Sequence, residues 1–179
     1  MTQNRIRQIT FSGMFLALCM VLPFLTGQIP QIGAMLSPMH IPVLICGFVC
    51  GPVWGMVVGA VAPILRSVLF GMPKLFPSAV CMMFELAAYG GFAGLLIRVL
   101  PKKSWAVYAS LILAMLGGRI VWGIAQYIFL GMSGTVFTLE MFLAGAFINA
   151  VPGIVLHLII IPPIVMLLGK AGLNLNGKR

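Results

Sequence analysis

The sequence predicts an all-α, polytopic membrane protein: a bundle of six transmembrane helices with both termini in the cytoplasm. Its 179 residues are 61% hydrophobic and only 7% charged, and the mean hydropathy is +1.15. Soluble domains carry about a quarter charged residues because they need a wet surface, so this composition excludes a water-facing globule. A membrane-spanning helix needs roughly 20 residues. Six spans therefore use nearly the whole chain as a single transmembrane domain, residues 1–179, and leave no room for a soluble catalytic or nucleotide-binding domain.

Helix breakers and charges divide the chain into helices at about residues 6–27, 39–50, 53–70, 78–100, 105–130 and 139–168. Residues 28–30, which end in Pro30, close the first helix. The second helix is short, and Pro42 is acceptable in its first turn, where the missing N–H is not needed. Gly51 and Pro52 then break the chain before the third helix.

The second half of the chain has equally clear boundaries. Pro73 and Pro77 exclude a continuous helix between the third and fourth spans. The run Pro101-Lys102-Lys103 closes the fourth helix, and Ser104 is a good N-cap for the fifth. Thr138 is a plausible N-cap for the sixth helix, which is expected to continue to Leu168.

The basic residues indicate the orientation. Eight of the eleven Lys and Arg residues fall at cytoplasmic ends if the N-terminus is inside, as the positive-inside bias requires: Arg5, Arg7, Arg98, Lys102, Lys103, Lys170, Lys178 and Arg179. The net charge of +9 is therefore interpreted as a feature of cytoplasmic loops, and no nucleic-acid partner is expected. The chain is expected to be a multi-pass protein of the cell membrane, with the lipid bilayer around it.

Six further ionisable side chains fall in the outer half of this topology or in its outer loop: His40, Arg66, Lys74, Glu85, Arg119 and Glu140. A charge inside a membrane costs on the order of 3 kcal/mol on insertion scales and faces the bundle interior or a wet cavity. Two interpretations stay open. The charges could form structural pairs, Glu85 with Arg119 and Arg66 with Glu140, or they could line a ligand pocket that opens outward.

The charge balance favours a ligand pocket for an anionic molecule. Arg66, Lys74 and Arg119 face only two carboxylates, Glu85 and Glu140, which leaves one positive charge over. Arginine suits a carboxylate because its planar fork can hold both oxygens.

Neighbouring polar and aromatic residues extend the candidate site. Trp122 and Gln126 follow Arg119 on the same helical stripe, and Tyr89 follows Glu85 by four residues. Asn149 is expected near the middle of the membrane. His157 is expected towards the cytoplasmic end, and we interpret it as a packing residue.

The sequence gives little support for catalysis or for a cofactor. It contains no Asp, so a Ser-His-Asp triad and a two-metal carboxylate site are excluded. Neither the two histidines nor the four cysteines have the spacing of a metal site, so no metal ligand is expected. No Walker A loop is present, and the chain is not expected to hydrolyse ATP.

Small residues recur at intervals of four: Gly47, Gly51, Gly55 and Gly59, then Gly90 and Gly94, and also Gly13 and Ala17 near the N-terminus. This spacing lets helix backbones approach closely in lipid. It indicates either tight packing inside the bundle or a docking face for another membrane protein.

The chain resembles the substrate-binding (S) components of energy-coupling factor (ECF) vitamin transporters. Six short helices in about 180 residues carry the resemblance, together with the runs LSPMHIPVLICGFVCGPVWG, PILRSVLFGMPKLFP and MMFELAAYG. It implies a bundle that holds a vitamin near its outer side, under a gating loop between the first two helices. It also implies a transmembrane scaffold protein and two cytoplasmic ATPases as partners, which use the ATP in place of this chain.

Members of that family commonly dock on the scaffold through an Ala-xxx-Ala pattern in the first helix, and Gly13 and Ala17 occupy the matching positions here. Pantothenate is the first hypothesis for the ligand, because it bears a carboxylate, and nicotinate or a folate-like compound fits the same argument. The alternatives are a stand-alone small secondary carrier or channel subunit, and a membrane enzyme that uses Glu85 and Arg119. A secondary carrier usually has paired broken helices, and the break at Gly51-Pro52 has no counterpart in the second half.

Overall fold

The computed structural model describes residues 2–26, 35–101, 103–132 and 138–176, and these ranges are helical almost throughout. The elements are α1 (Thr2–Val21) with the 3-10 turn η1 (Leu22–Thr26), α3 (His40–Cys50), α4 (Pro52–Phe70), the π-type turn η2 (Leu75–Ala79), α5 (Val80–Val99), α6 (Ser104–Met132), α7 (Leu139–Leu143), the π-type turn η3 (Ala144–Ile148) and α8 (Val151–Lys170). In the described ranges, five helical stretches are long and apolar enough to cross a membrane. The predicted all-α, multi-pass membrane fold is confirmed.

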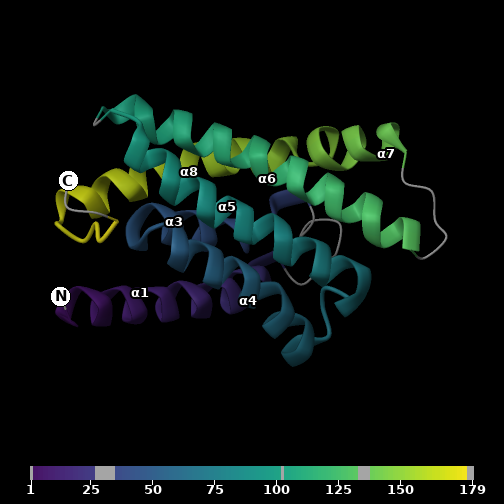
Figure 1. The fold of residues 1–179 in the computed structure, drawn as a ribbon, viewed down its shortest axis with the longest axis horizontal. Coiled ribbons are helices and arrows are strands. Elements are labelled where there is room, and N and C mark those ends of the chain that lie inside the picture. Colours follow the sequence, from purple (N-terminus) through teal and green to yellow (C-terminus); the bar gives the residue numbers. More distant parts are fainter. Residues whose placement is uncertain (1, 27–34, 102, 133–137, 177–179) are drawn as a thin grey trace.

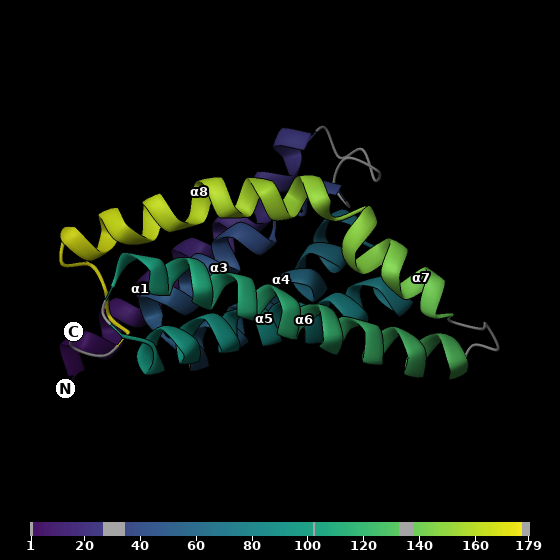
Figure 2. The same ribbon diagram turned by 90° about the horizontal axis from the view of Figure 1, so that it is seen from above.

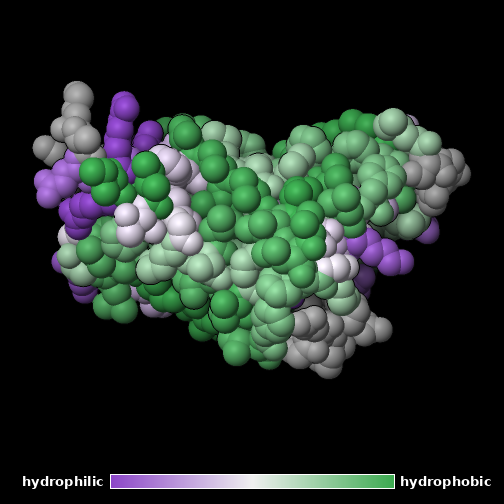
Figure 3. All heavy atoms as spheres, turned by 90° about the horizontal axis from the view of Figure 1, so that it is seen from below, coloured by the Kyte–Doolittle hydropathy of each residue, from purple (hydrophilic) through white to green (hydrophobic). Residues whose placement is uncertain are grey.

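The helices run up and down in chain order, so both termini lie at the same end of the bundle (Figure 1). Figure 3 shows that hydrophilic residues gather at this end, while hydrophobic side chains cover most of the middle of the face in view. By the positive-inside bias this end is cytoplasmic, in agreement with the orientation expected from the sequence.

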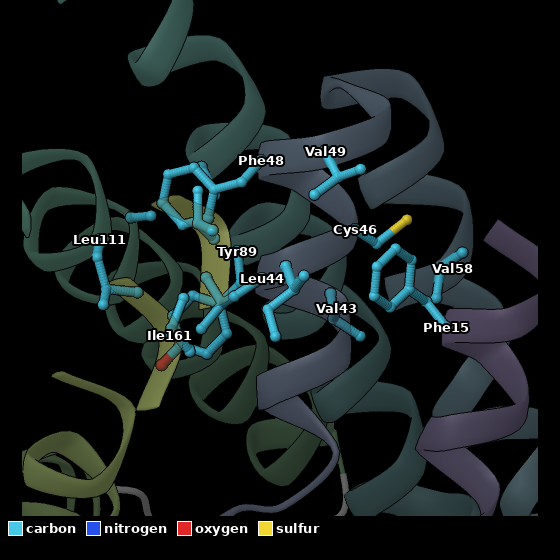
Figure 4. Packing of buried hydrophobic residues seen from close by; sticks show 14 of the residues in the cluster. Phe15, Val43, Leu44, Cys46, Phe48, Val49, Val58, Tyr89, Leu111 and Ile161 are labelled. Carbon is cyan, nitrogen blue, oxygen red and sulfur yellow. The ribbon is translucent and has the colours of Figure 1, made fainter. Parts of the chain in front are cut away.

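α3 is the core helix of the bundle. Its 11 residues rise only about 16 Å, which is too short to cross a bilayer. Every residue of α3 except Ile41 is buried, and it packs against α1, α4, α5 and α8. Buried side chains from all these helices and from α6 meet around it (Figure 4).

A tight break separates α3 from α4. Gly51 has φ +103°, a conformation that residues with a Cβ rarely adopt, and Pro52 starts α4 at a position where no N–H is needed. The predicted end of the second helix and start of the third are thereby confirmed within one residue.

Glycines hold α3, α4 and α5 together at backbone distance. A Cβ on Gly47 or Gly55 would collide with the carbonyl of Gly90, and a Cβ on Gly94 would collide with the backbone of Pro52. These glycines therefore pack inside the bundle. Of the two interpretations of their spacing, internal packing agrees with the structure.

The sixth predicted helix, residues 139–168, is not continuous, and this expectation is wrong. α7 and η3 form one short segment, a turn at residues 149–150 ends it, and α8 begins at Val151. Figure 2 shows α7 inclined to α8. The cause is Pro152, which has no N–H to donate to the preceding turn and whose ring clashes with it. The fourth predicted helix also begins irregularly, because Phe76 is extended before Pro77.

The C-terminal residues after α8 turn back under the cytoplasmic end of α3. The backbone N–H of Leu175 donates to the carbonyl of Val49 at 2.7 Å. The side-chain amide of Asn176 donates to the carbonyls of Gly47 at 3.3 Å and Gly94 at 2.9 Å. The Leu175 bond satisfies a carbonyl in the last turn of α3, and the Asn176 bonds tie the C-terminal residues to α3 and α5.

Candidate ligand-binding site

Glu85 is the centre of a buried polar cluster between α3, α5 and α6. It is 2% exposed, and its Oε1 lies 3.1 Å from Nη1 of Arg119 and 3.5 Å from Nε2 of His40. The ion pair with Arg119 is one of the structural pairs that the sequence left open. Since removing either partner would strand a buried charge, the two side chains form a single unit.

Tyr89 and His157 complete the cluster. Tyr89 lies one turn below Glu85 on α5 and is hydrogen-bonded to it, and its ring centroid is 5.1 Å from that of His40. On the other side of His40 lies His157, and the centroids of these two rings are 6.0 Å apart. We call these five residues, His40, Glu85, Tyr89, Arg119 and His157, the polar layer.

The position of His157 corrects the sequence analysis, which interpreted it as a packing residue near the cytoplasmic end. Because α8 starts only at Val151, His157 lies two turns below the start of that helix and at the level of Glu85. The helix break that Pro152 causes was the signal that could have found it.

The polar layer lies deep in the bundle. At a rise of 1.5 Å per residue, Glu85, Arg119 and His157 each stand about 20 Å from the cytoplasmic end of their helices. The hydrocarbon core of a bilayer is about 30 Å thick. Counted from the cytoplasmic helix ends, the layer is therefore in the outer half of the membrane.

Arg66 lies apart from the polar layer, at the outer ends of α1 and α4. Its Nη1 donates to the carbonyl of Met20 at 2.8 Å, and its guanidinium carbon lies 5.2 Å from the ring centroid of Phe24 and 5.3 Å from that of Phe70. Arg66 thus caps the C-terminal end of α1. The pairing with Glu140 that the sequence left open does not agree with this geometry, since Glu140 is exposed in the first turn of α7.

The other candidate residues lie outward of the polar layer. Trp122 stacks on Phe142, with ring centroids 6.3 Å apart, and so joins α6 to α7. Gln126 has a buried Oε1 with no hydrogen-bond partner in the described residues. Lys74 and Asn149 are exposed. The structure brings His40, Glu85, Tyr89 and Arg119 together, whereas Arg66, Lys74, Glu140 and Asn149 lie elsewhere.

Gly13 and Ala17 lie on the outward face of α1. Both are exposed, and a Cβ added at Gly13 would meet nothing within 4 Å. This stripe of small residues differs from the glycines of α3, α4 and α5, because no helix of the described chain covers it.

The polar layer offers hydrogen bonding and one ion pair, without the residues of a metal centre. Within the described ranges, no group of three or more His, Cys, Asp and Glu side chains could hold a metal ion. A multi-pass membrane protein that keeps such a layer inside an otherwise apolar bundle belongs to the class that binds or moves polar solutes, because intramembrane ionisable residues mark such functions.

The comparison with protein families identifies the class more narrowly. The family model described as "ECF transporter, substrate-specific component" matches residues 7–165, which is most of the chain. The chain therefore belongs to the family of substrate-specific components of ECF transporters. It is a transporter subunit of the cell membrane, and members of this family are not enzymes. Neither the curated proteins nor the solved structures contained a match.

Proposed function

We propose that this chain captures a vitamin from outside the cell and delivers it to an ATP-driven module, made of a transmembrane scaffold protein and two cytoplasmic ATPases. Membership of the ECF family supports a module of this kind. The observation that carries the proposal is the polar layer, in which His40, Glu85 and Arg119 come from three helices and meet in the outer half of the bundle.

The ligand that we propose is an anionic vitamin, with pantothenate first and nicotinate or a folate-like compound as alternatives. Because Arg119 and Glu85 neutralise each other, the surplus positive charge of the outer half belongs to Arg66 and the exposed Lys74. The described contacts of Arg66 are all with neutral groups, a carbonyl and two aromatic rings. Its remaining donors support an interaction with a carboxylate.

The site test is a binding measurement on the purified chain. Native mass spectrometry is expected to detect a retained vitamin, and a panel of pantothenate, nicotinate and folate is expected to contain a ligand. Arg119→Met should abolish retention. Since this change strands Glu85, the matched variant is Glu85→Gln/Arg119→Met, which keeps the layer neutral and should also fail to retain the vitamin.

Arg7→Met, at an exposed position near the N-terminus, is the control and should bind normally. Unchanged affinity in both Arg119 variants would remove Arg119 from the site.

The partner test is copurification. Mild detergent extraction of the tagged chain should bring down the scaffold and both ATPases. Uptake by vesicles that contain this chain alone would instead favour the stand-alone carrier and contradict the proposal.

A further inference from the structure

Two imidazoles face each other in the polar layer. His40 begins α3 and His157 belongs to α8, and their ring centroids are 6.0 Å apart with an angle of 21° between the planes. His40 is 3% exposed and His157 is 4% exposed. Each ring therefore has to satisfy its nitrogens from inside the protein or from a bound molecule.

The contacts of His40 assign its proton. Nε2 lies 3.5 Å from Oε1 of Glu85, and neither ring nitrogen of His40 has a hydrogen-bond partner among the described residues. We assign the hydrogen to Nε2, because that nitrogen is the one that faces the carboxylate. Arg119 already supplies one positive charge against Glu85, and a second buried cation would have no counter-charge. A neutral His40 leaves Nδ1 as a lone-pair acceptor.

In His157 the roles of the two ring nitrogens are reversed relative to His40. Its ring is hydrogen-bonded to the backbone of Ser37, and Nε2 is the nitrogen without a partner. We assign the bond as Nδ1–H donating to the Ser37 carbonyl, and the ring is then a neutral imidazole whose Nε2 accepts.

The layer consequently contains two buried acceptors that no donor of the described residues satisfies, Nδ1 of His40 and Nε2 of His157. Such atoms are costly unless something else pairs with them. A third acceptor, Oε1 of Gln126, is unsatisfied further out on α6. Nε of Arg119, Nε2 of His40 and Oε1 of Glu85 also have no hydrogen-bond partner among the described residues.

We infer that the transported ligand brings O–H or N–H donors to Nδ1 of His40 and Nε2 of His157. The inference rests on the proposed function and narrows its ligand class to molecules with at least two donors. Pantothenate qualifies with two hydroxyls and an amide N–H, and a folate-like compound qualifies with amino and ring N–H groups. Nicotinate does not, because at neutral pH it has no O–H or N–H to donate.

The test compares pantothenate, folate and nicotinate on the wild-type chain and on two variants of His157. His157→Asn keeps an amide N–H for Ser37 but has no atom at the position of Nε2, and it should weaken binding of the donor-bearing ligand about tenfold or more. His157→Gln places an amide oxygen near that position and should restore part of the affinity. A purely structural role would not produce this difference between Asn and Gln, and thermal melting of each variant checks the fold.

A second measurement uses the wild-type chain and so does not depend on the folding of a variant. Pantothenate with both hydroxyls methylated, or folate with its amino nitrogen dimethylated so that it carries no N–H, should bind at least tenfold more weakly than the parent compound. Equal affinity, unchanged binding in His157→Asn, or tighter binding of nicotinate than of the other two would overturn the inference and leave the proposed function intact. If none of the three bound and no vitamin were retained, the proposed ligand class would fail, and this inference with it.

Discussion

The carboxylate of Glu85 lies inside the bundle with one guanidinium and one imidazole beside it. In a hydrocarbon surrounding, such a group persists only when its charge is matched and its oxygens are bonded. Arg119 supplies the charge, while His40 and Tyr89 supply neutral contacts. Arg119 thus offsets the buried charge of Glu85, and loss of either partner would leave the other as an unpaired buried charge.

Arg119→Met should therefore destabilise the chain by about 3–5 kcal/mol, because Glu85 is left as an unpaired buried charge. The double variant Glu85→Gln/Arg119→Met should lose clearly less stability than the sum of the losses in Glu85→Gln and Arg119→Met. Unfolding by heat or denaturant in one fixed detergent measures the stability of all three variants. Additive losses of stability would show that the two side chains do not stabilise each other.

Arg66 illustrates a different way of holding a buried cation. It has a carbonyl and two aromatic faces as partners, which attract a guanidinium without neutralising it. The carbonyl belongs to the last turn of α1, where the helix dipole also favours a positive charge. Arg66 consequently keeps its charge while it positions the end of α1.

At the scale of helices, glycines with the same four-residue spacing have two different surroundings. Those of α3, α4 and α5 touch opposing backbone, whereas Gly13 of α1 faces open space. A helix face that is small, exposed and uncovered is suited to a second membrane protein. We therefore propose α1 as the face that docks on the scaffold.

Gly90→Ala should destabilise the bundle by about 1–3 kcal/mol, because its methyl group would overlap the backbone of Gly55.

Gly13→Leu should leave the unfolding transition and ligand binding unchanged, but the scaffold and the ATPases should no longer copurify with the chain. Gly131→Leu, which also enters open space but lies at the outer end of α6, is the control. If Gly13→Leu still copurified the module, the docking proposal for α1 would be wrong.

The whole molecule is organised along one axis. Both termini lie at the cytoplasmic end (Figure 1), where the described basic residues Arg5, Arg7, Arg98, Lys103 and Lys170 also lie. Hydrophobic side chains cover most of the middle of the face that Figure 3 shows, and the polar layer is inside. A ligand would then reach the polar layer from the outer ends of α1, α5 and α6, whereas the motor would act at the cytoplasmic ends of the same helices.

This orientation predicts which lysine can be labelled from outside. Lys74→Cys should react with a membrane-impermeant maleimide in intact cells, whereas Lys103→Cys should react only after the membrane is opened. Both lysines are exposed, and all four native cysteines are buried, so the parent chain should give little background. Labelling of Lys103→Cys in intact cells would reverse the assigned topology.

Local sequence signals were sufficient to predict where most helices begin and end. Proline, glycine and charge placed the ends of α3, α4, α5 and α6 within about two residues, because helix breaking acts on the adjacent turn. The structure places both termini at one end of the bundle (Figure 1). That this end is cytoplasmic stays a prediction, which depends on the number of basic residues and not on their contacts. The pairing of Glu85 with Arg119 was predicted as an alternative, because depth alone puts both groups in one layer.

The contacts between helices could not be predicted from the sequence and became clear only from the tertiary structure. Rotation of each helix about its axis decides which side chains meet, and glycine contacts of backbone against backbone set that rotation for α3, α4 and α5. Sequence spacing could not show that Arg66 caps α1, or that His157 joins His40 after the break at Pro152. Composition and breakers determined that this is a membrane bundle with charges in its outer half. Only the packing of helices, which is a property of pairs distant in sequence, decided which of those charges share a site.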